Sequence, residues 1–111
     1  MKDQCVIYRV HLSVKEALAG DYENWLKSHI SEMLNLPGFR GATMTQCEGL
    51  DSEEQAGYRE WVVDYTLNSR EDLERYFTEY SAKMRGDGLK RFEGQFTVRR
   101  WILSQNQEYT A

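Results

Sequence analysis

Apolar and polar residues alternate along the chain at 5–14 and again at 58–67. A period of two is typical of a strand that buries one face, and both segments are rich in β-branched or aromatic residues. Two further stretches, 39–48 and 95–103, are interpreted as strands, the first of them rich in threonine and methionine with a phenylalanine at its start. The pattern therefore predicts four strands.

Between Leu18 and Leu34 the apolar spacing changes to three and four residues, which predicts an amphipathic helix. Pro37-Gly38 is expected to end it. Its start is open between two signals, a capping-box spacing at Ser13–Glu16 and a later N-cap at Gly20-Asp21.

A second capping sequence, Ser69-Arg70-Glu71-Asp72, is followed at once by an apolar stripe from Leu73 to Met84. This spacing predicts a second helix. Gly86 and Gly88 are expected to close it, because glycine is a poor residue for a helix interior.

The predicted order is β-α-β-β-α-β. With right-handed crossovers this order gives a ferredoxin-like α+β fold, a four-stranded antiparallel sheet with two helices on one face. At 111 residues the chain fits a single domain, 1–111, with an ordered core of about 4–103. The polar segment 49–57 is expected to be a hairpin loop, and 104–111 a frayed tail.

In this fold the second face of the sheet carries no helix, and its predicted residues mix apolar and charged side chains. Such a surface favours a partly polar contact with a second copy of the chain. A catalytic cleft formed by charges on this face, Glu60 among them, is the alternative, and ion pairs between subunits are favoured over it. The candidate interface residues are Ile7, Arg9, Val62, Asp64, Arg99 and Trp101.

Composition limits the classes of partner and the cellular location that we expect for this chain. A net charge of −4 argues against a nucleic-acid backbone as ligand, and no stretch is apolar enough to span a membrane. The N-terminal segment lacks the layout of a signal peptide. Cys5 and Cys47 have no neighbouring ligand, so we expect two buried, reduced thiols, neither a disulfide nor a metal site, and a cytoplasmic protein.

One group of residues is a candidate for ligand binding. His29 follows Trp25 by one helical turn on the apolar stripe, where an imidazole can act as acid, base or hydrogen-bond donor. Aromatic residues of the strands and helices, Tyr8 and Tyr65 foremost, can line a small-molecule cavity there. The alternative is that these side chains are ordinary core, with His29 hydrogen-bonded to a carbonyl or a tyrosine. The candidate ligand-binding residues are Trp25, His29, Tyr8 and Tyr65.

Several segments resemble one small bacterial family of unknown function. They are Val6–Val10, Trp25-Leu26-x-x-His29-Ile30, Gly38-Phe39, the run from Tyr65 to Tyr76, and Gly88-Leu89-x-x-Phe92. The layout is similar to the dimeric α+β barrel superfamily, in which two ferredoxin-like subunits join their sheets face to face. That resemblance implies a homodimer. It transfers no catalytic residue, because the superfamily includes cofactor-free oxygenases, cyclases, isomerases and haem-handling proteins.

Two functional hypotheses follow. The first is a homodimeric binding or accessory module without a reaction of its own, whose possible partner is an unidentified small molecule. The second is a cofactor-free enzyme of the oxygenase, isomerase or cyclase type with a pocket near Trp25 and His29. No cofactor is expected in either case, because the chain has no nucleotide-binding glycine motif and no cluster of acidic metal ligands.

Overall fold

The computed structural model describes residues 5–50 and 56–111, and over them the chain forms one four-stranded sheet with helices packed on it. The middle of the predicted hairpin loop, 51–55, lies outside the described residues. The strands are β1 (Val6–Lys15), β2 (Phe39–Cys47), β3 (Tyr58–Leu67) and β4 (Phe96–Leu103). The helices are α1 (Ala19–Met33), α2 (Arg70–Glu79) and α3 (Ser81–Phe92), with a 3-10 turn at Glu16–Leu18 before α1.

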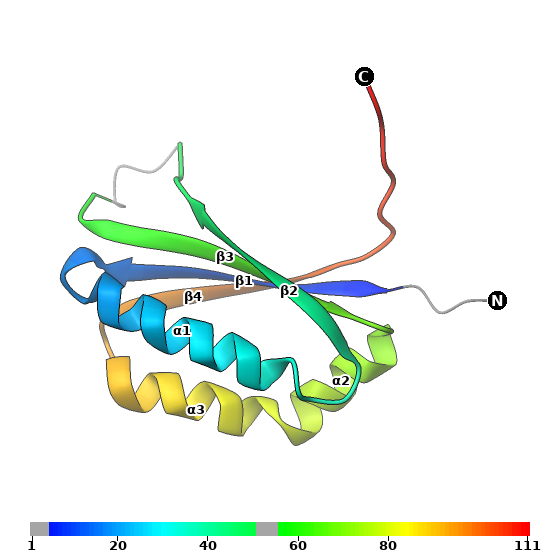
Figure 1. Ribbon diagram of the computed structural model, residues 1–111, viewed down its shortest axis with the longest axis horizontal. Helices are drawn as coiled ribbons and strands as arrows, with labels where there is room; N and C mark the ends of the chain where they lie inside the picture. Colours follow the sequence, from blue (N-terminus) through cyan, green and yellow to red (C-terminus); the bar gives the residue numbers. More distant parts are fainter. Residues whose placement is uncertain (1–4, 51–55) are drawn as a thin grey trace.

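The strands pair antiparallel in the order β2-β3-β1-β4. All three helices lie on the same side of the sheet (Figure 1). This is the ferredoxin-like α+β fold, and it confirms the fold predicted from the alternation of strand and helix patterns. In the part of the chain that is described, no helix is both long and apolar enough to cross a membrane.

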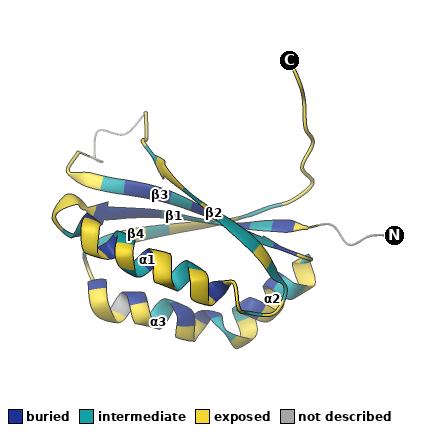
Figure 2. Cartoon of the chain, in the orientation of Figure 1, coloured by how far each residue is buried: buried dark blue, intermediate teal, exposed yellow. Residues whose placement is uncertain are grey.

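Burial follows the predicted period of two in the central strands. Figure 2 shows buried positions concentrated in β1 and β3 and on the helix surfaces turned toward the sheet. Tyr8, Trp61 and Tyr65 are each 2% exposed, whereas Trp101 on the helix-free face is 44% exposed. The hydrophobic core thus lies between the sheet and the helices, and one sheet face is left outside it.

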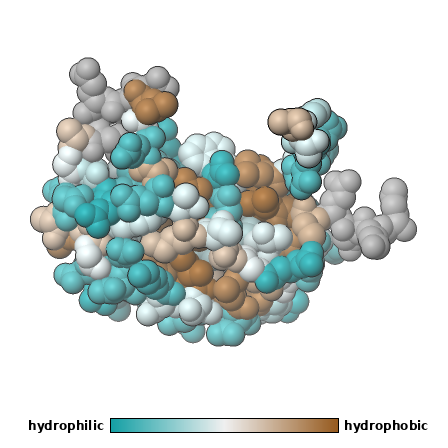
Figure 3. Space-filling view, turned by 45° about the horizontal axis from the view of Figure 1, so that its top comes forward, coloured by the Kyte–Doolittle hydropathy of each residue, from teal (hydrophilic) through white to brown (hydrophobic). Residues whose placement is uncertain are grey.

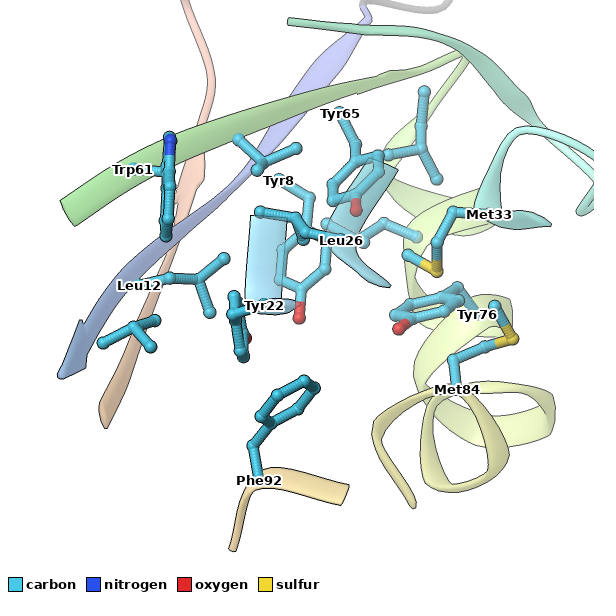
Figure 4. Packing of buried hydrophobic residues seen from close by; sticks show 14 of the residues in the cluster. Tyr8, Leu12, Tyr22, Leu26, Met33, Trp61, Tyr65, Tyr76, Met84 and Phe92 are labelled. Carbon is cyan, nitrogen blue, oxygen red and sulfur yellow. The ribbon is translucent and has the colours of Figure 1, made fainter. Parts of the chain in front are cut away.

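Aromatic side chains make up much of this core (Figure 4). Tyr22 of α1 stacks on Trp61 of β3 with ring centroids 6.2 Å apart and meets the edge of Phe92 at 4.9 Å. Offset and edge-to-face contacts of this kind add to the stabilisation from apolar burial. They hold α1, the end of α3 and the sheet together.

The prediction of one helix closed by Gly86 and Gly88 was wrong. The chain breaks the helix at Tyr80, where φ is −127°, and starts α3 at Ser81. α3 then continues through both glycines to Phe92. Gly88 lies where α3 closely approaches α1, and an added Cβ would lie 2.7 Å from the indole of Trp25. Packing between the two helices therefore favours glycine at this position.

The two capping predictions had different outcomes. Ser69 caps α2 as predicted, with its Oγ accepting a hydrogen bond from the Asp72 N–H at 3.2 Å. The candidate caps of α1 were wrong, because β1 continues through Ser13 to Lys15 and α1 begins at Ala19 without a side-chain cap. Burial of alternate β1 residues outweighs the local capping signal there.

The chain between α1 and β2 turns at Gly38, which has a φ of +85°. An added Cβ would lie 2.5 Å from Cβ of Asp72, so this position needs glycine both for its backbone conformation and for space. The C-terminal segment 104–111 has no regular structure and extends away from the sheet, as expected (Figure 1).

The expectation of two buried thiols was wrong. Both cysteines are free, but Cys5 is exposed and Cys47 is half-buried. Cys5 precedes β1, and Nη1 of Arg40 lies 2.8 Å from its sulfur.

Candidate functional site

A cavity of about 400 Å³ lies between the sheet and the helices. The four residues predicted to bind a ligand, Trp25, His29, Tyr8 and Tyr65, are all on its wall. Most of the remaining wall is aliphatic or aromatic, with residues such as Leu26 and Met33. The fold therefore brings the predicted candidates together around one largely apolar space.

Three tyrosines form one side of this cavity. Tyr8 comes from β1, Tyr65 from β3 and Tyr76 from α2, and the Tyr8 ring centroid lies 6.0 Å from that of Tyr65 and 5.7 Å from that of Tyr76. In Figure 4 the two sheet tyrosines point toward the helices and Tyr76 points back toward them. Burial raises the pKa of Tyr65 and raises that of Tyr76 to about 12. The three hydroxyls are thus hydrogen-bonding groups in an apolar wall, and Tyr65 and Tyr76 keep their hydroxyl protons at neutral pH.

Arg85 of α3 brings a positive charge to the same wall. Its Nη2 donates a long hydrogen bond to the Tyr8 hydroxyl, at 3.4 Å. Its Nε is buried and has no hydrogen-bond partner among the described residues. A buried charged donor without an acceptor costs free energy, so this N–H favours a ligand that offers an acceptor. Arg100 of β4 adds a second guanidinium to the lining.

His29 stacks on Trp25, with ring centroids 4.6 Å apart and an angle of 17° between the planes. Burial lowers the pKa of His29, against the opposing charges of Glu32 and Asp87, so the ring is neutral at neutral pH. The core alternative required a carbonyl or tyrosine partner, and the described residues provide His29 with no such hydrogen bond. The imidazole instead lines the cavity.

The predicted interface residues lie on the helix-free face of the sheet, at alternate positions of β1, β3 and β4. Arg9 donates two hydrogen bonds to Asp64 in the same chain, at 2.8 and 2.9 Å. These two charges therefore already have partners without a second subunit, whereas Trp101 and Arg99 remain exposed. Figure 3 shows hydrophobic residues interspersed with hydrophilic ones on the surface in view.

Sequence reasoning missed the two arginines of the cavity. Arg100 lies between Val98 and Ile102 in the inward-facing row of β4, so the period of two was a signal that could have found it. Arg85 had no such signal. Its direction depends on the restart of the helix at Ser81, which the apolar stripe does not reveal.

Comparison with known proteins gives one family match. Residues 5–106 match a family described as "Domain of unknown function (DUF4286)". No curated protein matches the chain.

Solved structures with the same arrangement of strands and helices come from unlike sources. A variant of SnoaB, a cofactor-independent oxygenase from Streptomyces nogalater, is 14% identical, with a TM-score of 0.67 over 95% of this chain and 96% of that one. A protein from Nitrosomonas europaea, provisionally described as an antibiotic biosynthesis monooxygenase, is 14% identical, with a TM-score of 0.64 over 95% of this chain and 93% of that one.

The de novo designed protein Foldit4 is also similar. It is 12% identical, with a TM-score of 0.61 over 93% of this chain and all of that one. At these identities the likeness concerns the fold alone, and a fold that was also designed from scratch carries no particular reaction with it.

Proposed function

The chain belongs to the DUF4286 family. We propose that it is a homodimer and that its cavity binds a small, mostly apolar molecule carrying an acidic oxygen. The cavity volume of about 400 Å³ is within the usual range for small-molecule sites. Its aromatic and aliphatic wall favours a ring system, and the tyrosine hydroxyls can orient a polar substituent on that ring.

The unpaired Nε of Arg85 is the observation that carries this proposal. A guanidinium lacks any acceptor function, so its partner must be an acceptor, and a carboxylate, enolate or phenolate oxygen is the strongest partner available to it. The Tyr8 hydroxyl already accepts a hydrogen bond from Nη2 of Arg85. An anionic ligand oxygen beside Tyr8 would give Nε of Arg85 an acceptor as well. Arg100 adds attraction of the same sign.

Binding of 2-naphthoate, compared with the neutral 2-naphthalenemethanol of nearly the same shape, tests this directly. Quenching of tryptophan fluorescence reports occupancy, because Trp25 lines the cavity. We expect the carboxylate to bind more tightly, and Arg85→Gln to weaken it on the order of tenfold or more, the usual cost of a lost charge-assisted hydrogen bond. Arg75→Gln, an exposed arginine of α2 paired with Glu79, is the matched control and should change nothing. Equal binding of the two probes would contradict the proposal.

A second candidate function is a cofactor-free enzyme that begins by removing a proton from its ligand. The neutral, unpartnered imidazole of His29 in the cavity favours it. His29 would accept a proton from an activated C–H or O–H group, and Arg85 with the tyrosine hydroxyls would stabilise the oxyanion that develops.

Deuterium exchange at the acidic carbon of 2-tetralone in D₂O separates this candidate from simple binding. We expect the parent protein to accelerate the exchange and His29→Gln to abolish the acceleration, while Arg75→Gln retains it. If the parent and His29→Gln exchange equally, the binding function stands alone.

The homodimer in this proposal rests on the helix-free face of the sheet. Trp101 is 44% exposed there, and the apolar Ile7 and Val62 lie on the same face of the sheet. A second sheet packed on this face would remove these side chains from water, which is the usual source of stability for a symmetric pair.

A further inference from the structure

Three residues that bind metals in other proteins converge on the helix-free face of the sheet, opposite the cavity. They are His11 of β1, Cys47 of β2 and Glu60 of β3, and one ligand atom of each lies within 4.8 Å of the other two. His11 Nε2 and Glu60 Oε1 are already 2.7 Å apart. Nothing in their spacing along the sequence indicates this, because they come from three different strands.

Strand register explains the convergence. Cys47 is the direct partner of Glu60 across β2 and β3. His11 pairs with Val62, two residues along β3 from Glu60, so it lies diagonally across from the carboxylate on the same face. Three neighbouring strands thus hold the three side chains, which is a more rigid support than a loop provides.

We propose that His11, Cys47 and Glu60 form a binding site for Zn²⁺, with water at a fourth position. Imidazole nitrogen, thiolate sulfur and carboxylate oxygen are the ligand types that zinc takes, and a site with three protein ligands keeps one position open. Zinc bonds of about 2.0–2.3 Å place tetrahedral ligand atoms roughly 3.3–3.8 Å apart. Zn²⁺ binding would require side-chain rotations, with the His11–Glu60 contact opening from 2.7 Å.

Charge and burial fit a cation at this place. Glu60 is 6% exposed, an unusual burial for a carboxylate on a sheet face that no helix covers. Zn²⁺ with one carboxylate, one thiolate and a neutral imidazole makes a group of zero net charge. On binding, the thiol proton of Cys47 leaves to solvent and the imidazole proton lies on Nδ1, away from the metal. Arg9 and Asp64, another pair of charges on this face, already neutralise each other and need not change.

Cobalt substitution tests the site, because a Co²⁺–thiolate bond gives a near-ultraviolet charge-transfer band that nitrogen and oxygen ligands do not. We expect the full-length parent protein to bind one Co²⁺ per chain with this band, and one equivalent of Zn²⁺ to displace it. Cys47→Ser should lose the band and weaken Zn²⁺ binding at least tenfold. Cys5→Ser is the control. Cys5 is the other free thiol and lies outside the cluster, so this variant should behave like the parent.

A second variant separates a site from a chance contact. His11→Gln should weaken Zn²⁺ binding at least tenfold while it leaves 2-naphthoate binding in the cavity unchanged, so a failure here is distinguishable from a failure of the proposed function. An absent charge-transfer band in the parent, a band that persists in Cys47→Ser, or equal Zn²⁺ affinity of parent and His11→Gln would each overturn the proposal. In that case His11 and Glu60 form a structural hydrogen bond, and Cys47 lies next to it without binding a metal.

Discussion

Gly88 sets how closely α3 approaches α1, because the Trp25 indole occupies the space where a side chain would begin. We expect Gly88→Ala to lower the free energy of unfolding by about 1–3 kcal/mol, the usual cost of overpacking, since the added Cβ would lie 2.7 Å from the ring. Gly86→Ala is the matched control in the same helix, with nothing within 4 Å of its added Cβ. It should be neutral or stabilising by up to about 1 kcal/mol, because alanine is the better helix former. Urea unfolding of both variants measures the difference, and equal values would mean that Trp25 does not pack on Gly88.

His29 predicts a dependence of stability on pH. Burial lowers its pKa below the ordinary 6.5, so below that pH the unfolded chain binds a proton that the folded chain does not. The free energy of unfolding should therefore decrease as the pH falls through about 6.5 toward the folded pKa. His29→Gln should flatten this part of the curve. Urea titrations of parent and variant between neutral and mildly acidic pH measure it, and NMR titration of the imidazole should give a midpoint below that of a free histidine. A raised midpoint would contradict the neutral ring.

At the level of single residues, the sequence predicted which side chains point inward wherever a strand alternates without interruption. Tyr8, Trp61 and Tyr65 follow from that rule and are buried. Arg85 and the His11–Cys47–Glu60 cluster do not follow from it. The first depends on a helix break, and the second on the register between three strands, and neither leaves a local pattern in the sequence.

At the level of elements, local signals and tertiary packing compete, and packing wins where the two conflict. The capping-box spacing at Ser13 is overridden because β1 continues through it with Val14 completely buried. Gly88 does not end α3, and Trp25 fills the space where its Cβ would lie, so the glycine serves packing between helices. The signal at Ser69 succeeds because nothing opposes it there, and α2 starts directly after β3 ends.

Removal of that cap should cost a measurable part of the stability. Ser69 satisfies the Asp72 N–H at the start of α2, so Ser69→Ala leaves an unpaired donor in the first turn. We expect a loss of about 1 kcal/mol in the free energy of unfolding. Ser31→Ala, an exposed serine of α1 bonded only to the Lys27 carbonyl, should change the value by less than about 0.5 kcal/mol. Urea denaturation compares the two, and equal losses would mean that the cap contributes nothing specific.

At the level of the whole molecule, the two faces of the sheet carry different sets of side chains. One face, under the helices, holds the core and the cavity with Arg85. The other holds paired charges, the three converging metal ligands and the exposed Trp101. This division follows from the β-α-β-β-α-β order, which places every described helix on one side and leaves the other face of the sheet without a helix.

The helix-free face of the sheet is where we expect a second copy of the chain to pack. Trp101, on the edge strand β4, lies beside His11 with ring centroids 6.4 Å apart, and it is 44% exposed in the single chain. Large aromatic residues that become buried in an interface often carry much of its binding energy, and Trp101 is the exposed tryptophan of this face, so a charge there should weaken the dimer strongly. We expect the parent protein to run as a dimer in light scattering at micromolar concentration, and Trp101→Asp to run as a monomer with unchanged helix content. Tyr109→Asp changes an aromatic residue of the tail that is 86% exposed, and it should remain a dimer. A monomeric parent protein would contradict the dimer, and a Trp101→Asp dimer would mean that the subunits meet through another surface.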